Sequence, residues 1–409
     1  MEAALVSSDD SRINSILDSA IADSVLGTNA PDSVRRAADR VASRQLSAAI
    51  ASEDPKQLKG ALVSAKRLNA TGVPEFNQAV ERYRKVRKLP AGWDVGKMVL
   101  HRKGDKMVAK LDVNDASVEA KFQRLLDLTH RKVYTRDRMG GAVPESLKLL
   151  SVTAITNDDL WGDYMVCREN IRLELEKDSS DFVRHAVDTM QSADASDAGT
   201  AEGTESVADI ATSLAADFGE PILESINEVF LFHGTSAAAA DGITTNDFQV
   251  NLAGTNVGTL YGRGIYLAEN STKSDEYTRA NSSGDRYLLV CRAVLGRALY
   301  IDTKETDPRV CESSCLRGKY HSVLGDRKKC RGTFREFVVF AEDQVYANYI
   351  LKYRRVEAAA DPSRMFQVVC PPGVQPGNTI QVQTPDGKMA MVVVPAGITA
   401  GQSFTIQTS

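Results

Sequence analysis

Along residues 9–90, apolar side chains recur every three or four positions, which is the spacing of an amphipathic helix. Proline stands near the start of two of these runs, at Pro55 and Pro74, where it is compatible with the first turn of a helix. The earliest run contains Ile13, Ile16, Leu17, Ala20, Ile21 and Val25 and ends before Gly27. The pattern predicts a small helical bundle.

A weak alternation of apolar and polar residues follows the helical runs. Residues 98–100 and 106–113 alternate on either side of Gly104-Asp105, which predicts a short hairpin at the end of an N-terminal region, residues 1–115. Residues 56–110 hold fourteen Lys or Arg against four Asp or Glu. Such an excess can contact phosphate groups, or it can be a solvated face. Few aromatic residues interleave with the charges, which favours the solvated face and leaves nucleic-acid binding open.

The next stretch combines helical and strand-like patterns. Apolar residues at helical spacing predict a helix around residues 122–129, and residues 147–155 form an apolar, strand-like run. Residues 136–144 between them are rich in turn-forming residues. A further helix is predicted from Asn157 through Leu175.

An acidic stretch interrupts this part of the chain. Residues 188–220 carry eight acidic residues and no basic one. Residues 191–205, rich in Ser, Ala, Thr and Gly, predict a flexible linker or insertion, and residues 206–218 predict a short helix.

From residue 225 to residue 353 the pattern changes to short apolar strands separated by turns and two short helices. The predicted strands are residues 229–232, 265–268, 287–294, 337–340 and 350–353. This order predicts an α+β fold with a largely antiparallel sheet.

The last part of the chain contains an internal repeat. Residues 368–383 recur as residues 392–407 at a constant offset of 24 residues, which brings Gly373 onto Gly397. Two copies of strand–turn–strand predict a small β-repeat module, residues 366–409. It holds no acid–base or metal-ligand constellation, so the predicted role is structural or in interactions.

Composition and charge narrow the class of protein. The chain has 409 residues, of which 43% are hydrophobic and 25% charged, as is typical of a globular protein of two or more domains. The net charge of −4 indicates no particular partner. No apolar run reaches the eighteen or so residues of a membrane span, and the first residues lack the pattern of a signal peptide. Six cysteines in so long a chain do not resemble a disulfide framework, which predicts a reducing intracellular compartment, nuclear or cytoplasmic.

Residues 229–277 concentrate polar and aromatic groups beyond what a core needs. His233 and Gly234 end an apolar run, so a ring donor stands beside backbone that a ligand can approach closely. Ser274 and Tyr277 are three residues apart and would share one face of a helix. With Tyr266, the second tyrosine makes a slot for a flat ring, and the glycine backbone and serine hydroxyl suit a carboxamide. A nicotinamide ring meets these requirements.

Breaking a bond from ribose C1′ to such a ring builds positive charge on the sugar, so a carboxylate is needed nearby. The candidate is Glu336, which directly precedes the apolar residues 337–340. The alternative is that Glu336 is only a surface residue at the start of a strand.

These motifs resemble the poly(ADP-ribose) polymerase family of diphtheria-toxin-like ADP-ribosyltransferases. The resemblance rests on residues 231–235, 261–268, Lys273-Ser274 with Tyr277, and residues 336–340 followed by 344–349. Residues 155–164 are similar to the start of that family's transferase domain. The resemblance covers about residues 118–355 and implies an ADP-ribosyltransferase-type antiparallel β core with flanking helices.

The resemblance implies how NAD would be bound. His233 would hold the hydroxyls of the adenosine-side ribose, and Gly234 and Ser274 would bind the nicotinamide amide. Tyr266 and Tyr277 would sandwich the nicotinamide ring.

It also implies a catalytic carboxylate. Glu336 would hydrogen-bond the nicotinamide-side ribose, stabilise the developing cation and help to orient the acceptor. Together with His233 and Tyr266 it completes the family's His-Tyr-Glu signature. Thr235 and Lys273 lie in the cofactor-binding motifs, and Lys273 also matches a position that handles the acceptor.

The implied activity is transfer of ADP-ribose from NAD to protein acceptors, including the chain itself, with release of nicotinamide. Retention of the glutamate favours activity and permits polymer formation, but poly and mono transfer both stay open. The alternative function is a catalytically silent scaffold or interaction protein that binds NAD or ADP-ribose.

Two features limit the resemblance. No segment matches the autoinhibitory helical subdomain of the DNA-damage-responsive members, so activation by DNA breaks is not supported. Some relatives carry a zinc-binding loop, and Cys311, Cys315, His321 and Cys330 are suitable zinc ligands. Their spacing is irregular, so the prediction favours unliganded thiols over zinc.

Overall fold

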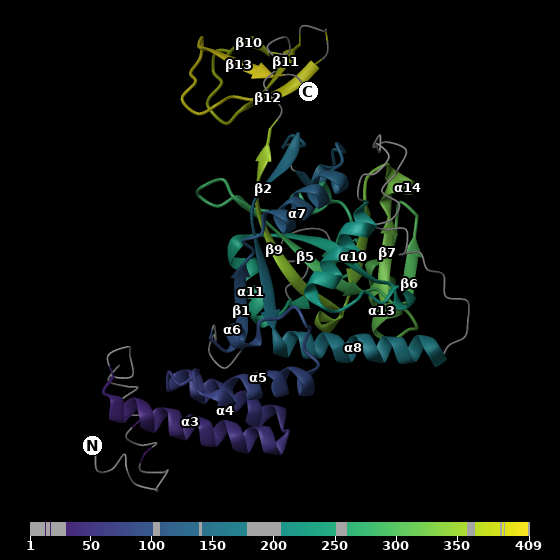
Figure 1. The fold of residues 1–409 in the computed structure, drawn as a ribbon. Helices are drawn as coiled ribbons and strands as arrows, with labels where there is room; N and C mark the ends of the chain where they lie inside the picture. Colours follow the sequence, from purple (N-terminus) through teal and green to yellow (C-terminus); the bar gives the residue numbers. More distant parts are fainter. Residues whose placement is uncertain are drawn as a thin grey trace. The chain divides into compact units, whose positions relative to one another are not determined.

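The computed structural model describes residues 13, 17, 30–100, 107–138, 141–177, 206–250, 260–357, 365–384, 387 and 389–407. The chain divides into two compact units, Met1–Arg355 and Val356–Ser409 (Figure 1). Three predictions fall outside the described residues: the acidic linker at 191–205, the turn at Gly104-Asp105 and most of the helix around residues 13–25.

The first described helices are α3 (Asp32–Ser52), α4 (Pro55–Arg67), α5 (Pro74–Arg87) and α6 (Val95–Leu100). Proline stands in the first turn of α4 and of α5, where its missing N–H costs no helical hydrogen bond. The Asp54 carboxylate caps α4 by accepting a bond from the backbone N–H of Lys56 at 2.8 Å. The helices bury apolar side chains in one shared core, among them Val41, Leu46, Leu58, Leu62 and Phe76.

The predicted hairpin at the end of this region is wrong. Residues 98–100 belong to α6, and β1 (Val108–Asp112) pairs antiparallel with β2 (Ser146–Asn157) instead. An alternation over so few residues does not distinguish a strand from one turn of an amphipathic helix. Met98 is fully buried in the core of the helices, which accounts for its apolar character.

Two sheets with flanking helices form the rest of the first unit. The five-stranded sheet has the order β1-β2-β9-β5-β3, and the four-stranded sheet has the order β4-β8-β7-β6. The remaining strands are β3 (Glu228–Thr235), β4 (Ile265–Leu267), β5 (Arg286–Val294), β6 (Ala298–Ile301), β7 (Ser322–Asp326), β8 (Arg335–Val339) and β9 (Val345–Val356).

The mixed α and β architecture with antiparallel sheets is confirmed, and so are the five strands predicted between residues 229 and 353. The structure adds β6 and β7, which pair parallel with each other. Of these two, β6 is a run of only four apolar residues, which is too short to distinguish a strand from other structure.

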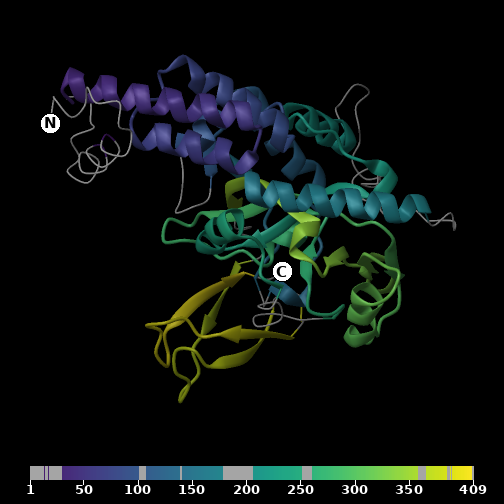
Figure 2. The same cartoon turned by 90° about the horizontal axis from the view of Figure 1, so that it is seen from below.

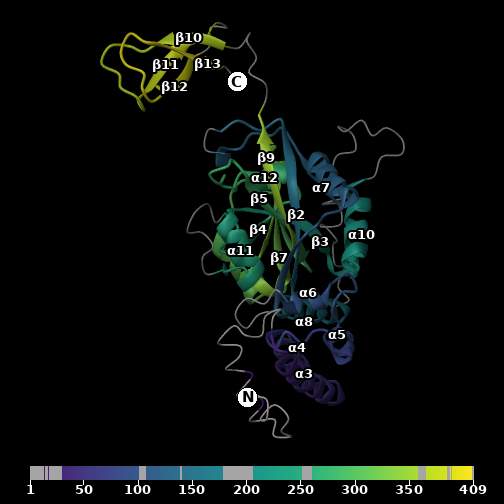
Figure 3. The same ribbon diagram turned by 60° about the vertical axis from the view of Figure 1, so that its left-hand side comes forward.

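Alternating side chains of β3 face two different layers. Phe230 and Phe232 pack with α7 (Ala116–Thr129) and α10 (Val207–Phe218), whereas Leu231 packs with α11 (Ala237–Asn246). Figure 3 shows α7 and α10 on one side of the five-stranded sheet and α11 on the other. Since neighbouring residues of a strand point to opposite faces, one apolar run supplies both layers. This burial on both sides holds the end of β3 in place.

The end of β3 also joins the two sheets. Phe232 exchanges two backbone hydrogen bonds with Ala268, at 2.8 and 3.0 Å, directly after β4. β4 in turn pairs with β8, with Tyr266 opposite Val338. These pairings bring His233, Tyr266 and Glu336 to one region, although they are far apart in the sequence.

Helices α4 and α5 are joined to the sheets through α8 (Asp158–Lys177), beside which the purple and blue helices lie in Figure 2. The buried carboxylate of Asp158 accepts a hydrogen bond from the Tyr83 hydroxyl and lies 3.4 Å from the Lys59 ammonium. Arg87 donates to the Asp158 carbonyl at 2.8 Å. Part of the positive charge in residues 56–110 is therefore used in packing between helices.

We expect Asp158→Ala to lower the free energy of unfolding by about 1–3 kcal/mol, because it leaves a buried tyrosine hydroxyl without an acceptor. The matched control is Asp159→Ala. Asp159 meets the same lysine at 3.0 Å, but its side chain is 44% exposed, so we expect a change within about 0.5 kcal/mol. Urea unfolding measures both variants, and equal losses would contradict a special role for the buried carboxylate.

The second unit contains the repeated sequence. Its strands are β10 (Met365–Val369), β11 (Thr379–Gln383), β12 (Met389–Val393) and β13 (Ser403–Gln407). β10 pairs with β13 and β11 pairs with β12, so each copy of the repeat pairs with the other copy. The equivalent Gly373 and Gly397 have φ of 80° and 85°, a conformation that favours glycine, which explains their recurrence.

Candidate active site

His233 lies near the end of β3 with its ring fixed by a backbone contact. Its Nδ1 lies 3.0 Å from the Tyr266 carbonyl oxygen. Because a carbonyl can only accept, Nδ1 carries the hydrogen and Nε2 of the neutral ring is an acceptor. Burial lowers the pKa of His233, so the ring stays neutral near pH 7. The site therefore has an acceptor suited to a sugar hydroxyl.

Gly234 allows helix α12 (Ser271–Asp275) to lie directly against β3. A Cβ at Gly234 would overlap the carbonyl oxygen of Ser274, so glycine is required for this approach. The Ser274 hydroxyl donates to the Phe232 carbonyl at 3.0 Å, which fixes the last turn of α12 on the strand. Thr235, the next residue, is buried opposite Tyr287.

Tyr266 is held by the glycine-containing turn before it. Its hydroxyl donates to the Gly262 carbonyl at 2.9 Å and accepts from the backbone N–H of Tyr261 at 3.0 Å. Gly262 has a φ of 101°, which an L side chain rarely adopts. The conformation of this turn therefore favours glycine at position 262, and its backbone groups bind the hydroxyl of Tyr266.

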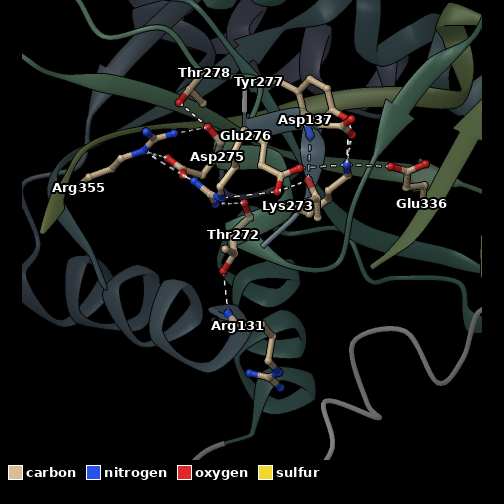
Figure 4. A network of polar contacts seen from close by, with 12 residues as sticks. Arg131, Asp137, Thr272, Lys273, Asp275, Glu276, Tyr277, Thr278, Glu336 and Arg355 are labelled. Carbon is tan, nitrogen blue, oxygen red and sulfur yellow. Dashed lines mark hydrogen bonds and ion pairs between the residues drawn. The ribbon is translucent and has the colours of Figure 1, made fainter. Parts of the chain in front are cut away.

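Lys273 is the centre of a buried polar network (Figure 4). Its ammonium donates to Asp137 Oδ2 at 2.8 Å, Glu276 Oε2 at 3.0 Å and Tyr277 Oη at 2.9 Å. It also forms an ion pair with Glu336 Oε1 at 3.0 Å. Burial alone would lower the pKa of Lys273, but Glu336 and the other neighbours raise it above its ordinary value, so the lysine is cationic.

The structure brings the predicted residues together in two groups. One group is His233 with Tyr266 and Gly234 with Ser274, and the other is Lys273 with Tyr277 and Glu336. Glu336, in β8, is 8% exposed, so the interpretation as a surface residue is excluded. Burial is the main cause that raises the pKa of Tyr266 and of Tyr277, and the charge of Glu336 adds to both shifts.

Sequence reasoning missed the contribution of residues 131–138. Tyr277 Oη donates to Asp137 at 2.9 Å, and Arg138 forms a buried ion pair with Asp275 at 2.9 Å. Burial opposes ionisation of Asp137, but Lys273 lowers the pKa of this carboxyl below its ordinary value. The sequence showed only a turn-rich loop here. Nothing in such a loop indicates that it contacts residues 275–277, which lie far along the chain.

The four residues considered as zinc ligands have other surroundings. Cys311 and Cys315 lie one turn apart in α13 (Pro308–Leu316), His321 Nδ1 accepts from the Arg297 backbone N–H at 2.9 Å, and Cys330 contacts the Thr303 carbonyl. Across the described ranges, no three His, Cys, Asp or Glu side chains are grouped as a metal site.

No helix in the described ranges has the length and apolar character to cross a membrane.

The turn after α11 supports His233. Phe248 packs edge-on against the His233 ring, with ring centroids 5.2 Å apart, and its N–H donates to the Asp247 carboxylate at 2.7 Å. Burial raises the pKa of Asp247 to about 6, and the nearby Glu342 adds to the rise.

This shift predicts a pH-dependent effect of Asp247→Asn. A carboxyl whose pKa is higher in the folded state destabilises the protein once it ionises, so stability is lost as pH rises from about 4 to about 6. Asparagine keeps the acceptor for Phe248 without the charge. We expect the variant to unfold at a higher temperature than wild type at pH 7.5, with the difference vanishing near pH 4. A constant difference at both pH values would contradict the assignment.

The fold and the site define a class of protein: a mixed α and β domain with a neutral histidine, two tyrosines and a lysine–glutamate ion pair where the two sheets meet. Residues 204–355 match the family model of the poly(ADP-ribose) polymerase catalytic domain. The match begins after α8, so it does not include residues 131–138.

Three curated relatives agree with this family. A protein named poly [ADP-ribose] polymerase tankyrase from Caenorhabditis elegans is 28% identical over 189 residues, which is 45% of this chain and 8% of the relative. The human mono-ADP-ribosyltransferase PARP12 is 28% identical over 136 residues, 32% of this chain and 18% of the relative. Human mono-ADP-ribosyltransferase PARP14 is 26% identical over 142 residues, 32% of this chain and 7% of the relative. The chain therefore spans less than a fifth of the length of these relatives.

Proposed function

We propose that the chain is an NAD-dependent ADP-ribosyltransferase that uses protein acceptors and releases nicotinamide. The observation that carries the proposal is Glu336. It is a nearly buried carboxylate 3.0 Å from Lys273, beside Tyr277, within the segment that matches the family. A scaffold that only binds NAD has no need of a buried carboxylate at this point, because its desolvation is unfavourable.

The site residues have two roles, binding of NAD and catalysis of the transfer. His233 Nε2 accepts from a hydroxyl of the adenosine-side ribose, and the Gly234 backbone with Ser274 binds the carboxamide of the substrate. Tyr266 and Tyr277 hold the nicotinamide ring between them. These contacts place the glycosidic bond of NAD near Glu336.

The reaction breaks the bond between ribose C1′ and the nicotinamide nitrogen, and nicotinamide leaves with the electron pair. Positive charge then develops on the ribose, and the Glu336 carboxylate stabilises it while accepting a hydrogen bond from a ribose hydroxyl. The acceptor side chain attacks C1′ and loses its proton. Lys273 stays protonated and keeps the negative charges around the site compensated.

The test is to incubate the chain with NAD labelled on the adenine side and to measure nicotinamide release and labelled protein. We expect both products from the wild-type chain. A diffuse ladder on a gel would indicate polymer, and one sharp band would indicate mono transfer. Binding of NAD without release of nicotinamide would instead support the scaffold.

A further inference from the structure

The segment that precedes the family match contacts the site at several points. The backbone N–H of Arg131 donates to Thr272 Oγ1 at 2.7 Å, and Thr135 Oγ1 donates to Glu276 at 2.8 Å. Arg138 donates to the Thr272 carbonyl at 2.8 Å, in addition to its ion pair with Asp275. The partners Thr272, Asp275 and Glu276 belong to α12 or follow it directly, and Figure 4 shows Arg131 joined to Thr272. Residues 131–138 are therefore held to α12 without the help of Asp137.

The donors of Lys273 are limited in number. An ammonium group has three N–H donors, and those of Lys273 are directed to Asp137, Glu276 and Tyr277. Glu336 lies equally near, at 3.0 Å, but meets the ammonium as an ion pair. Glu336 thus gains the positive charge of Lys273 while its oxygens keep their capacity to accept.

Asp137 accounts for part of this arrangement. Its Oδ2 accepts from both Lys273 and Tyr277, so it directs one N–H of the lysine away from Glu336 and also holds the tyrosine hydroxyl. Without Asp137, the freed N–H would turn to Glu336, whose carboxylate lies 3.0 Å from the ammonium and is not yet one of its hydrogen-bond acceptors. A carboxylate that accepts a charge-assisted hydrogen bond from lysine is a weaker acceptor for a ribose hydroxyl.

We propose that Asp137 is a positioning residue for the transfer reaction: by binding Lys273 and Tyr277, it leaves the Glu336 carboxylate free to accept from the ribose of NAD. The inference rests on the proposed function, since it concerns how Glu336 reaches its substrate. It assigns a part of the reaction to a residue outside the family match.

The first experiment compares Asp137→Ala and Asp137→Asn in the full chain by nicotinamide release. We expect kcat of the alanine variant to fall roughly tenfold, the scale of one hydrogen bond to a charged group, with KM for NAD changed less than twofold. The asparagine variant should recover most of kcat, because its carboxamide oxygen still accepts from Lys273 and Tyr277. A purely structural role would instead change KM and the unfolding temperature together with kcat.

The control is Glu145→Gln. Glu145 is an exposed carboxylate close in sequence to the same loop and pairs with Lys132, so its loss should leave kcat unchanged. A second experiment repeats Asp137→Ala in a Lys273→Met background. If Asp137 acts through Lys273, the added substitution reduces nicotinamide release less in that background than in the wild type, and the remaining effect is the one exerted through Tyr277.

The outcomes separate this inference from the proposed function. An active wild type with an equally active Asp137→Ala variant overturns the inference and leaves the function in place. Equal losses in the alanine and asparagine variants overturn it as well. A wild-type chain that binds NAD but releases no nicotinamide overturns both.

Discussion

Glu336→Gln is expected to reduce nicotinamide release roughly a hundred- to a thousand-fold while leaving the affinity for NAD within a few-fold of wild type. The reason is that glutamine keeps the size and one acceptor oxygen of the side chain but removes the negative charge that faces the developing cation. The ground state of NAD needs that charge less than the transition state does, so the loss falls on turnover.

Two measurements separate the effect on NAD binding from the effect on turnover. NAD affinity is measured by calorimetry, and turnover by nicotinamide release, with the exposed Glu305→Gln as a control that removes a distant carboxylate. If the wild type forms polymer, elongation should weaken more than NAD binding in Glu336→Gln. Equal losses of binding and turnover would contradict the role given to Glu336.

Glu228→Ala is expected to lower the free energy of unfolding by about 3–5 kcal/mol, the largest stability effect predicted for this chain. Glu228 lies fully buried at the start of β3, where its carboxylate accepts from Tyr164 at 2.7 Å and from Arg168 at 2.9 Å. The Arg292 guanidinium, also fully buried, is 3.1 Å away. Alanine would leave two cationic side chains in a dry environment without this carboxylate.

Both tryptophans of the chain report on this region, since Trp93 and Trp161 pack at 5.8 Å and Arg292 lies over the Trp161 ring. Urea unfolding followed by tryptophan fluorescence therefore measures the loss directly. The matched control is Glu224→Ala, an exposed carboxylate in the turn just before β3, for which the expected change is within about 0.5 kcal/mol. A similar loss in both variants would contradict a stabilising ion-pair cluster.

The helices and strands could be predicted wherever the apolar pattern was long. Residues 206–218 illustrate this, because α10 begins after a Ser206–Asp209 capping box and ends at Gly219 in a left-handed conformation. The error at residues 98–100 has the opposite cause, since three residues fit either period. β1 forms by pairing with β2, and nothing in the local sequence of β1 identifies β2 as its partner.

The site could be predicted where its residues are close in the sequence. His233-Gly234 and Lys273–Tyr277 each form one local motif, and Glu336 could be proposed because the chemistry needs a carboxylate. Asp137 could not be proposed, because its hydrogen bond to Lys273 joins residues 136 positions apart.

The sequence by itself therefore determined the periods of the helices and strands, the 24-residue repeat and the residue types of a candidate NAD site. These features depend on spacing along the chain, which the sequence contains. Only the tertiary structure decided that Asp137, Glu276 and Tyr277 take the donors of Lys273 while Glu336 forms an ion pair with it. The physical reason is that hydrogen bonds act over about 3 Å, so their partners are chosen by how strands and helices pack.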